Sequence, residues 1–370
     1  MRLRPGLVFV HRWASLVAAL FWIVQAATGL FAVFHWEIDD ATVAGEVRPL
    51  DLDGIERRAA ELAGPESGRH VDSIWSTAGA PNRFDVFLTA ASPDRGQVVR
   101  IDGAGRVLRT RADGESIAAG GLVDTLVRVH QSLLAGDPGK WVVGASGLLL
   151  LVNFALGAAV AWPRRGQWRR ALAPAATTSG AGRLYAWHRA LGLWAMAPAA
   201  FLVAAGVLLA LEGTTERVIG PAAVDPPALS MPAGSAPRIG MAAAVKVALA
   251  RYPEAALSGV GFPSPDSAWW AIRLRQSGEL RRAYGKTRVY VSAADGETVV
   301  DFDALSSPPS RRFVDSLFSF HTGEMGGLPG RIAVAGIGLW LAAMNLLGLS
   351  LWSARRRLRR AREVSGHPAS

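Results

Sequence analysis

Long uncharged apolar segments dominate the pattern of hydrophobic and polar positions along the chain. Four segments run for about 20 residues without a charged side chain, roughly the length of helix that crosses ~30 Å of hydrocarbon at ~1.5 Å per residue. They are residues 14–34, 141–162, 190–211 and 332–352. Tryptophans lie mostly near the ends of these segments, as in interfacial belts. We therefore predict four transmembrane helices.

Two longer polar segments, at about residues 37–140 and 212–330, separate the apolar ones. Each begins with a predicted helix, at 52–62 or at 241–250. Short alternating runs, which are typical of strands, follow each helix. These runs are residues 72–75, 83–89, 97–101 and 107–110 in the first segment, and 257–261, 269–275, 287–291 and 298–301 in the second. The pattern predicts two small α+β domains outside the membrane.

Arginines indicate how the chain is oriented in the membrane. They cluster at the N-terminus, in the short loop after the second apolar segment and in the C-terminal tail, where acidic residues are almost absent. The positive-inside rule places these three regions in the cytoplasm. The formal net charge of +10 therefore reflects topology, and we expect no nucleic-acid partner. The first apolar segment is longer than a signal-peptide core, so we interpret it as a retained anchor.

Parts of the first half of the sequence reappear in the second half. His11-Arg12 and its following apolar run match His188-Arg189 and its run, 177 positions later. Residues 122–130, which end in His130, match residues 313–321, which end in His321, 191 positions later. Four of the seven histidines thus occupy two pairs of equivalent positions, each close to an apolar segment. Ionisable residues beside a bilayer are rare enough to suggest a functional site.

Paired histidines of this kind favour haem, because haem iron takes one or two axial bases and neutral imidazole is the usual one. His11 and Gly29 are 18 residues apart, five full helical turns, so both lie on one face of the first helix. His188 and Gly206 have the same spacing on the third. Small residues along these faces would leave room for a flat macrocycle. They would equally permit close helix packing, which is the alternative explanation.

The inner pair, His11 and His188, is predicted at the cytoplasmic end, where the two imidazoles would bind one haem iron from opposite faces. Arg12 and Arg189 would then be close enough to pair with the haem propionates. The alternative is that both histidines are interfacial residues that extend towards water.

The outer pair, His130 and His321, precedes the second and fourth apolar segments by about ten residues. Each histidine lies on an amphipathic segment that we expect to break at a Gly-x-Pro-Gly motif, and both imidazoles could turn inward onto a second haem. Lys140 and Arg331 follow at matching positions and would serve its propionates. The alternative is a pair of interface helices whose histidines only cap or hydrogen-bond.

His35 is a secondary candidate as a metal ligand. It lies 24 residues after His11, about 240° around the helix and on another face. Its equivalent in the second half is Glu212, so the duplication does not support it.

Taken together, these motifs resemble the PepSY-associated transmembrane family of bacterial inner-membrane proteins, which includes ferric-siderophore reductases and iron-regulated membrane proteins. The resemblance is carried by His11-Arg12-Trp13 with Thr28-Gly29, Val129-His130-Gln-Ser-Leu133, Trp187-His188-Arg-Ala-Leu-Gly192, Phe320-His321-Thr-Gly323 with Leu328-Pro-Gly-Arg331, and Gly348…Trp352. It implies a four-helix membrane core, two periplasmic PepSY-like domains and, in the reductases, two b-type haems. PepSY modules also occur as inhibitory domains of peptidases.

The expected fold is an α-helical membrane protein of two pseudo-symmetric repeats, with four transmembrane helices and two small α+β PepSY-like periplasmic domains. The predicted helices cover residues 1–36, 141–162, 185–211 and 332–353. The predicted periplasmic domains cover residues 37–140 and 212–331, and each ends in an interface helix. A cytoplasmic loop at 163–184 and a basic cytoplasmic tail at 354–370 complete the chain.

The sequence lacks the motifs of several other chemistries: it has no Walker loop, no dinucleotide-binding GxGxxG turn and no HExxH zinc motif. A zinc or copper site built from the outer histidines stays open. We predict an inner-membrane oxidoreductase that carries two b-type haems (haem b) per chain and passes electrons to a periplasmic ferric siderophore. The electron donor would be a cytoplasmic reductase or membrane quinol. The alternative is a non-redox membrane sensor or regulator that binds a peptide or protein in the periplasm.

Overall fold

The computed structural model describes residues 3–64, 68–90, 96–113, 117–174, 180–220, 225–230 and 236–364. Within it the chain divides into two compact units. One unit is helical and comprises residues 1–33, 129–211 and 320–370. The other contains the sheet and comprises residues 34–128 and 212–319.

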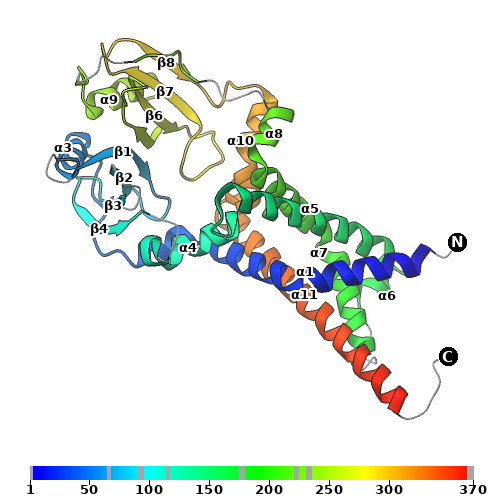
Figure 1. Cartoon of the computed structure of the whole chain (residues 1–370). Coiled ribbons are helices and arrows are strands. Elements are labelled where there is room, and N and C mark those ends of the chain that lie inside the picture. The colour runs from blue at the N-terminus through cyan, green and yellow to red at the C-terminus, as the bar shows by residue number, and fades with distance from the viewer. Residues whose placement is uncertain are drawn as a thin grey trace. The chain divides into compact units, whose positions relative to one another are not determined.

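Four long helices form the helical unit (Figure 1). They are α1 (Leu3–Val33), α5 (Gly136–Ala161), α7 (Gly180–Ala210) and α11 (Gly327–Val364). Helix α1 packs against α5 and α11, and α7 also packs against both of them, which closes a four-helix bundle. Within the described residues, four helices are long and apolar enough to cross a membrane. The chain is therefore a membrane protein with lipid as a partner.

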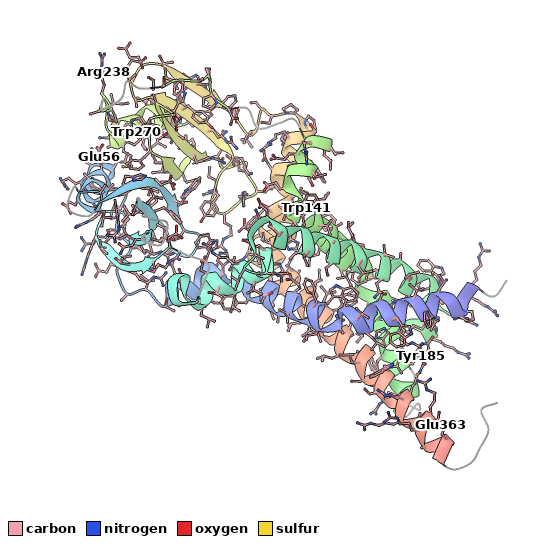
Figure 2. All side chains as sticks on the ribbon, in the orientation of Figure 1. Glu56, Trp141, Tyr185, Arg238, Trp270 and Glu363 are labelled. Carbon is pink, nitrogen blue, oxygen red and sulfur yellow. The ribbon has the colours of Figure 1, made fainter. Side chains whose placement is uncertain are left out.

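The helices extend beyond the predicted apolar segments, mainly at the ends that carry arginines. Helix α11 continues to Val364 through the basic residues of the predicted tail. The guanidinium of Arg355 lies 5.5 Å from the ring centroid of Tyr185, and that of Arg356 lies 5.3 Å from the ring centroid of Trp352. Helix α1 begins and α11 ends at the same end of the bundle (Figure 1). Trp141 projects from the start of α5 (Figure 2).

The chain breaks at the start of each Gly-x-Pro-Gly motif, where the first glycine, Gly136 or Gly327, has a positive φ and begins the next long helix. Helix α4 (Ile117–Ser132) ends at Ser132, Leu133 and Leu134 have positive φ, and α5 begins at Gly136 with the proline in its first turn. Proline is well tolerated there, because the first N–H groups of a helix have no intrahelical acceptor. The second glycine of the motif is needed for close packing, since a Cβ at Gly139 would overlap the carbonyl of Ser132.

The second half has a similar corner. Helix α10 (Pro309–Thr322) is followed by the short 3-10 helix η3 (Glu324–Gly326) before α11 begins at Gly327. Gly323 has a φ of +79°, and a Cβ there would lie 2.5 Å from the carbonyl oxygen of Gly330. Glycine is therefore required at this corner by conformation and by space.

A single antiparallel sheet of eight strands forms the centre of the other unit, with the order β4-β3-β2-β1-β5-β6-β7-β8. The strands are β1 (Arg69–Ser76), β2 (Phe84–Ala90), β3 (Gln97–Ile101), β4 (Val107–Ala112), β5 (Ala256–Gly261), β6 (Trp269–Arg275), β7 (Thr287–Ser292) and β8 (Val299–Phe302). All eight contain or overlap a predicted run. The sequence predicted two separate domains, whereas the strands of both segments share one sheet, joined where β1 pairs with β5.

One face of the sheet carries the hydrophobic core. Helices α3 (Leu52–Leu62) and α9 (Met241–Arg251) pack on this face, against strands of both halves. Alternate strand residues point into the core, including Val86, Ile272 and Val289, which are almost completely buried. The opposite face carries charged and aromatic side chains. Two short helices, α2 (His35–Ala41) and α8 (Glu212–Val218), complete the described part of this unit.

Candidate haem sites

A large cavity opens within the helical unit between all four long helices. Its volume is about 1420 Å³, and both histidines of the inner pair line it. The ring centroids of His11 and His188 are 6.4 Å apart, and their planes are inclined by 64°. Apolar ligand pockets are usually about 300–1,000 Å³ in volume, so this cavity is large enough for a macrocyclic cofactor.

The His11 ring is held by helix α5. Its Nδ1 lies 3.1 Å from the carbonyl oxygen of Asn153. The side chain of Asn153 donates to Ser15 (2.9 Å), and the Ser15 hydroxyl donates to the His11 carbonyl (2.8 Å). A Cβ at Gly157 would approach the Cε1 of His11 to 3.1 Å. Helix α5 thus fixes both the position and the orientation of this imidazole.

His188 contacts helix α11 in a similar place but lacks the hydrogen bond. A Cβ at Gly348 would lie 3.6 Å from its Cε1. Its Nδ1 is buried and hydrogen-bonds to no atom of the described chain. A buried polar nitrogen of this kind normally has a partner. The Nδ1 of His188 therefore lies at the cavity without a hydrogen-bond partner among the described residues.

The outer pair lies closer to parallel, with 6.0 Å between the centroids of His130 and His321 and 22° between their planes. The Nδ1 of His130 lies 3.1 Å from the carbonyl oxygen of Gln25, and that of His321 lies 2.9 Å from the carbonyl oxygen of Leu202. Each ring lies directly against a glycine. A Cβ at Gly29 would be 2.7 Å from His130, and one at Gly206 would be 2.6 Å from His321.

Three of the four histidines follow one rule. Nδ1 faces a backbone carbonyl of a neighbouring helix, and the glycine against the ring is four residues further along that helix. The carbonyl and glycine are Asn153 and Gly157 for His11, Gln25 and Gly29 for His130, and Leu202 and Gly206 for His321. A carbonyl can only accept, so Nδ1 must carry the proton. The lone pair of Nε2 is then free to bind a metal.

These distances match the needs of a metal bound between two imidazoles. Two rings that bind one metal from opposite sides, each through a bond of about 2 Å, hold their centroids roughly 6 Å apart. Both pairs meet this requirement. Among the residues that the structure describes, no group of three or more His, Cys, Asp or Glu side chains could hold a metal ion. The arrangement therefore fits haem, whose porphyrin supplies the other ligands, better than a protein-only zinc or copper site.

A comparison with protein-family profiles matches residues 8–355 to the PepSY-associated TM region. The match includes most of each long helix, the whole sheet and the four paired histidines. The chain belongs to this family. A comparison with curated proteins gave no match.

In this PepSY-associated TM protein, the basic residues next to the inner pair lie at the cavity wall. Arg12 and Arg189 both line the cavity. The guanidinium of Arg12 stacks 5.7 Å from the ring centroid of Trp13, and Arg189 donates to the carbonyl of Ala161 (2.9 Å). Both side chains are thus positioned where a carboxylate of a cavity ligand could reach them.

The basic residues proposed for the outer pair are in different settings. Lys140 is exposed and pairs with Asp137 at 2.8 Å. Arg331 is 5 % exposed and donates to the carbonyl oxygen of Val33 (2.7 Å), the last residue of α1. Arg331 therefore caps α1, and Lys140 remains the more accessible cation.

His35 lies in the unit that contains the sheet, as the first residue of α2. Its ring centroid is 4.6 Å from that of Trp36. The structure therefore does not assign it to either histidine pair.

An aromatic layer lies between the two pairs within the helical unit. Trp22 is buried and donates to the hydroxyl of Ser146 (3.0 Å), while Trp340 donates to the carbonyl of Leu191 (3.0 Å). Both tryptophans also line the cavity that holds His11 and His188. Gly29 contacts His130 of the outer pair and lies 18 residues after His11 on α1. At ~1.5 Å per residue, the two histidine pairs are therefore separated by about 27 Å along this helix. The two tryptophans thus form part of the wall of the inner cavity.

Asn153, Gly157 and Gly348 were not recognised from the sequence as parts of a site. The spacing placed Gly29 on the same face of α1 as His11, and in the structure Gly29 contacts the ring of His130, from the other pair. The missing signal was a glycine on the facing helix, which becomes recognisable only when it is known which helices are neighbours.

Proposed function

We propose that this protein is a two-haem membrane oxidoreductase, with one b-type haem between His11 and His188 and a second between His130 and His321. The observation that carries the proposal is the pairing itself. Four duplicated histidines meet as two pairs at a spacing suited to one metal each. A sensor that used its helices only as an anchor would not need matched imidazoles at two levels.

Haem, when bound, would supply reversible one-electron transfer, with its potential tuned by the axial ligands and by burial. The protein's own residues define its setting. The backbone carbonyls of Asn153, Gln25 and Leu202 fix three imidazoles with Nε2 free. A hydrogen bond from Nδ1 to a carbonyl orients the imidazole and increases the basicity of its Nε2. Arg12 and Arg189 would hold the propionates of the inner haem by charge-assisted hydrogen bonds.

Arginine placement supports an inner-membrane protein with both termini in the cytoplasm and the sheet unit in the periplasm. Electrons would enter at the inner pair from a cytoplasmic reductase or from quinol and leave from the outer pair. The proposed acceptor is a ferric siderophore in the periplasm. Reduction weakens the hold of oxygen ligands on iron, so electron transfer would release the metal for import.

The first test is a dithionite-reduced minus oxidised absorption spectrum of the purified protein, with haem counted per chain. We expect two low-spin haems with bis-imidazole spectra. His11→Ala or His188→Ala should remove one haem and His130→Ala or His321→Ala the other. His70→Ala is a matched control, because His70 lies on β1 in the sheet unit, where its Nε2 is 2.6 Å from Thr89. Full haem content in all four paired-histidine variants would contradict the assignment.

The second test addresses the acceptor. Reduced protein in oriented vesicles is mixed with ferric siderophores on the periplasmic side, and oxidation of the haem band is followed by stopped flow. We expect rapid reoxidation by at least one chelate. The inner-pair variants should lose re-reduction from the cytoplasmic side and keep an outer haem that dithionite reduces. Haem that stays reduced with every chelate in a broad panel would argue for a sensor.

A further inference from the structure

Arginines on the polar face of the sheet occur as directly opposed cross-strand pairs. Arg100 on β3 pairs in register with Arg109 on β4, and Arg273 on β6 pairs in register with Arg288 on β7. All four alternate with core residues and so project from the face opposite α3 and α9. Like charges directly opposite each other are destabilising. Each pair therefore needs a source of negative charge.

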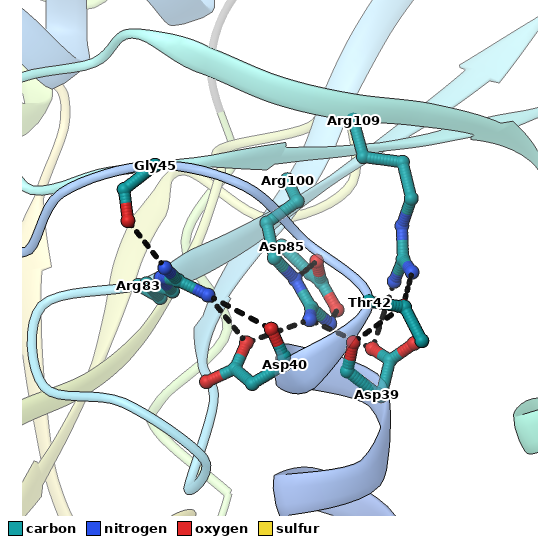
Figure 3. A network of polar contacts seen from close by, with 8 residues as sticks. All are labelled: Asp39, Asp40, Thr42, Gly45, Arg83, Asp85, Arg100 and Arg109. Atoms are coloured by element: carbon teal, nitrogen blue, oxygen red, sulfur yellow. Dashed lines mark hydrogen bonds and ion pairs between the residues drawn. The ribbon is translucent and has the colours of Figure 1, made fainter.

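The first pair is neutralised by the protein itself (Figure 3). Arg100 binds both carboxylate oxygens of Asp85 at 2.8 Å and contacts Asp39 at 2.7 Å and Asp40 at 3.1 Å. Arg109 pairs with Asp39 at 2.8 Å. Two of these carboxylates come from the short helix α2, which is held against the sheet by the network. No additional anion is needed here.

The second pair has no such neutralisation. Neither Arg273 nor Arg288 forms an ion pair within 4.0 Å with any residue that the structure describes. Arg273 makes one long hydrogen bond, 3.5 Å, to the carbonyl of Gly285. The two halves of the sheet thus contain the same opposed arginine pair in different surroundings. Carboxylates bind the pair Arg100 and Arg109, whereas no described carboxylate forms an ion pair with Arg273 or Arg288.

More positive charge surrounds the second pair. Lys286 pairs with Asp315 at 3.3 Å, but that carboxylate is shared with Arg311 at 3.1 Å. Two further carboxylates of this region are also engaged. Glu279 accepts hydrogen bonds from the backbone N–H of Gln276 and Thr287 and from the Thr287 hydroxyl. Asp303 accepts from the Gln276 side chain, the backbone N–H of Leu305 and the Ser306 hydroxyl. The carboxylates in reach are therefore already engaged, and positive charge is in excess.

These cations are partly buried, and two of them lie against aromatic rings. The guanidinium of Arg273 lies 5.8 Å from the ring centroid of Trp75, and that of Arg281 lies 4.0 Å from the ring centroid of Phe318. Burial lowers the pKa of Arg273 to about 10, and the charge of Arg288 adds to this shift. Burial also lowers the pKa of Lys286, which Asp315 opposes and Arg281 and Arg273 reinforce. The folded sheet thus keeps preorganised cations close together despite their repulsion.

We propose that these four side chains, Arg273 on β6, Arg288 on β7, and Arg281 and Lys286 on the segment between these strands, bind an oxyanion ligand. They are here named the arginine face. Two guanidinium groups on adjacent strands offer paired N–H donors, which suit carboxylate groups bound in bidentate fashion. Since this site rests on the proposed function, the substrate that it selects is a ferric chelate with carboxylate ligands and a net negative charge.

The experiment measures binding without electron transfer, using gallium(III)–citrate as a redox-inert anionic chelate. Isothermal titration of the full-length protein should show binding that weakens with salt. Arg273→Gln and Arg288→Gln should each lower the affinity roughly tenfold or more, as expected for the loss of a charge-assisted hydrogen bond. A positively charged gallium trihydroxamate should bind more weakly than gallium citrate. Free citrate without metal shows whether the site recognises the carboxylates alone.

The matched control is Arg238→Gln, which removes the same charge from an exposed side chain at the periphery of the same unit (Figure 2). An equal loss of affinity in this control, or no loss in either arginine-face variant, would overturn the inference. Misfolding has an independent readout, since removing one of two opposed cations should leave the melting temperature unchanged or raise it. Haem content should not change in the arginine-face variants. If the protein binds gallium citrate through these residues but contains no haem, the proposed function is wrong and the anion-binding site is still supported.

Discussion

Gly29 on α1 lies so close to the ring of His130 that a Cβ at this position would be 2.7 Å from Cε1. Real Cβ atoms do not approach a ring carbon so closely, so any larger residue must displace the imidazole. The carbonyl that faces Nδ1 of the same ring belongs to Gln25, one turn earlier on α1. One turn of helix therefore sets both the distance and the orientation of this histidine.

Gly29→Val is expected to reduce the haem content from two per chain to one, because the valine side chain moves His130 away from His321. The remaining haem should be the inner one, which keeps its own pair of imidazoles. Haem is counted by pyridine haemochrome assay of the purified protein. Gly336→Val is the control, since a Cβ at Gly336 meets nothing within 4 Å. Two haems in Gly29→Val would mean that this contact does not position the ligand.

Arg100→Met should destabilise the sheet unit strongly. Its side chain is 3 % exposed, and its guanidinium contacts three carboxylates. Breaking a buried charge pair typically costs about 3–5 kcal/mol because the partners remain unpaired. We expect a large decrease in the temperature at which tryptophan fluorescence of the full-length protein reports unfolding. Lys246→Met is the comparison. It removes an ion pair with Asp53 in which both side chains are exposed, and such pairs contribute little.

Acid should release α2 from the sheet. Burial raises the pKa of Asp39, but hydrogen bonds from Arg109 and Arg100 and their charges outweigh burial and bring the pKa below its ordinary 3.8. A carboxylate with a lowered folded-state pKa stabilises the fold above its unfolded pKa, and that stabilisation is lost as the pH falls through the folded value. The protection of residues 35–41 against hydrogen exchange, taken relative to the intrinsic exchange rate at each pH, should therefore decrease below about pH 4.

Asp39→Asn serves as the control for this titration. Residues 35–41 of this variant should be less protected than in the wild type already at neutral pH and should lose less further protection in acid. If wild type and variant gave parallel pH profiles, the acid response would have to come from other groups.

Membrane topology can be mapped by single cysteines, because the natural sequence contains none. Glu46→Cys and Ser277→Cys lie at exposed positions of the sheet unit, and Gln167→Cys lies at an exposed position between α5 and α7. A membrane-impermeant maleimide should label the first two in intact spheroplasts and the third only after permeabilisation. Labelling of Gln167→Cys without permeabilisation would reverse the orientation inferred from the arginines.

The membrane helices and most strands could be predicted from the sequence because their signals are local. An uncharged run of about 20 residues or a short alternation identifies an element without knowledge of its neighbours. The pairing of β1 with β5 could not be predicted, since Ile74 and Val260 are far apart in the sequence and no local pattern records their register. For the same reason the sequence predicted two separate domains, whereas their strands form one sheet.

The histidines of the candidate sites were recognisable because they are duplicated, but their surroundings were not. Asn153 and Gly157 hold His11 from another helix, and only the packing of α5 against α1 reveals them. Arg331 shows the reverse case. Its position in the motif suggested a ligand for propionate, whereas its buried guanidinium binds the carbonyl at the end of α1. Spacing along the chain indicates which residues recur, but not which atoms they contact.

The junction between β1 and β5 has a consequence for how the protein is made. The ribosome completes β1 before it has synthesised residues 77–255, which include two of the long apolar helices, and only then produces β5. At about 5–20 residues per second, this interval is roughly 10–35 s. During this time β1 presents an unpaired edge, which can recruit strands from other chains. Closure of the sheet therefore comes late in biogenesis, at a time set by synthesis and membrane insertion of the intervening helices.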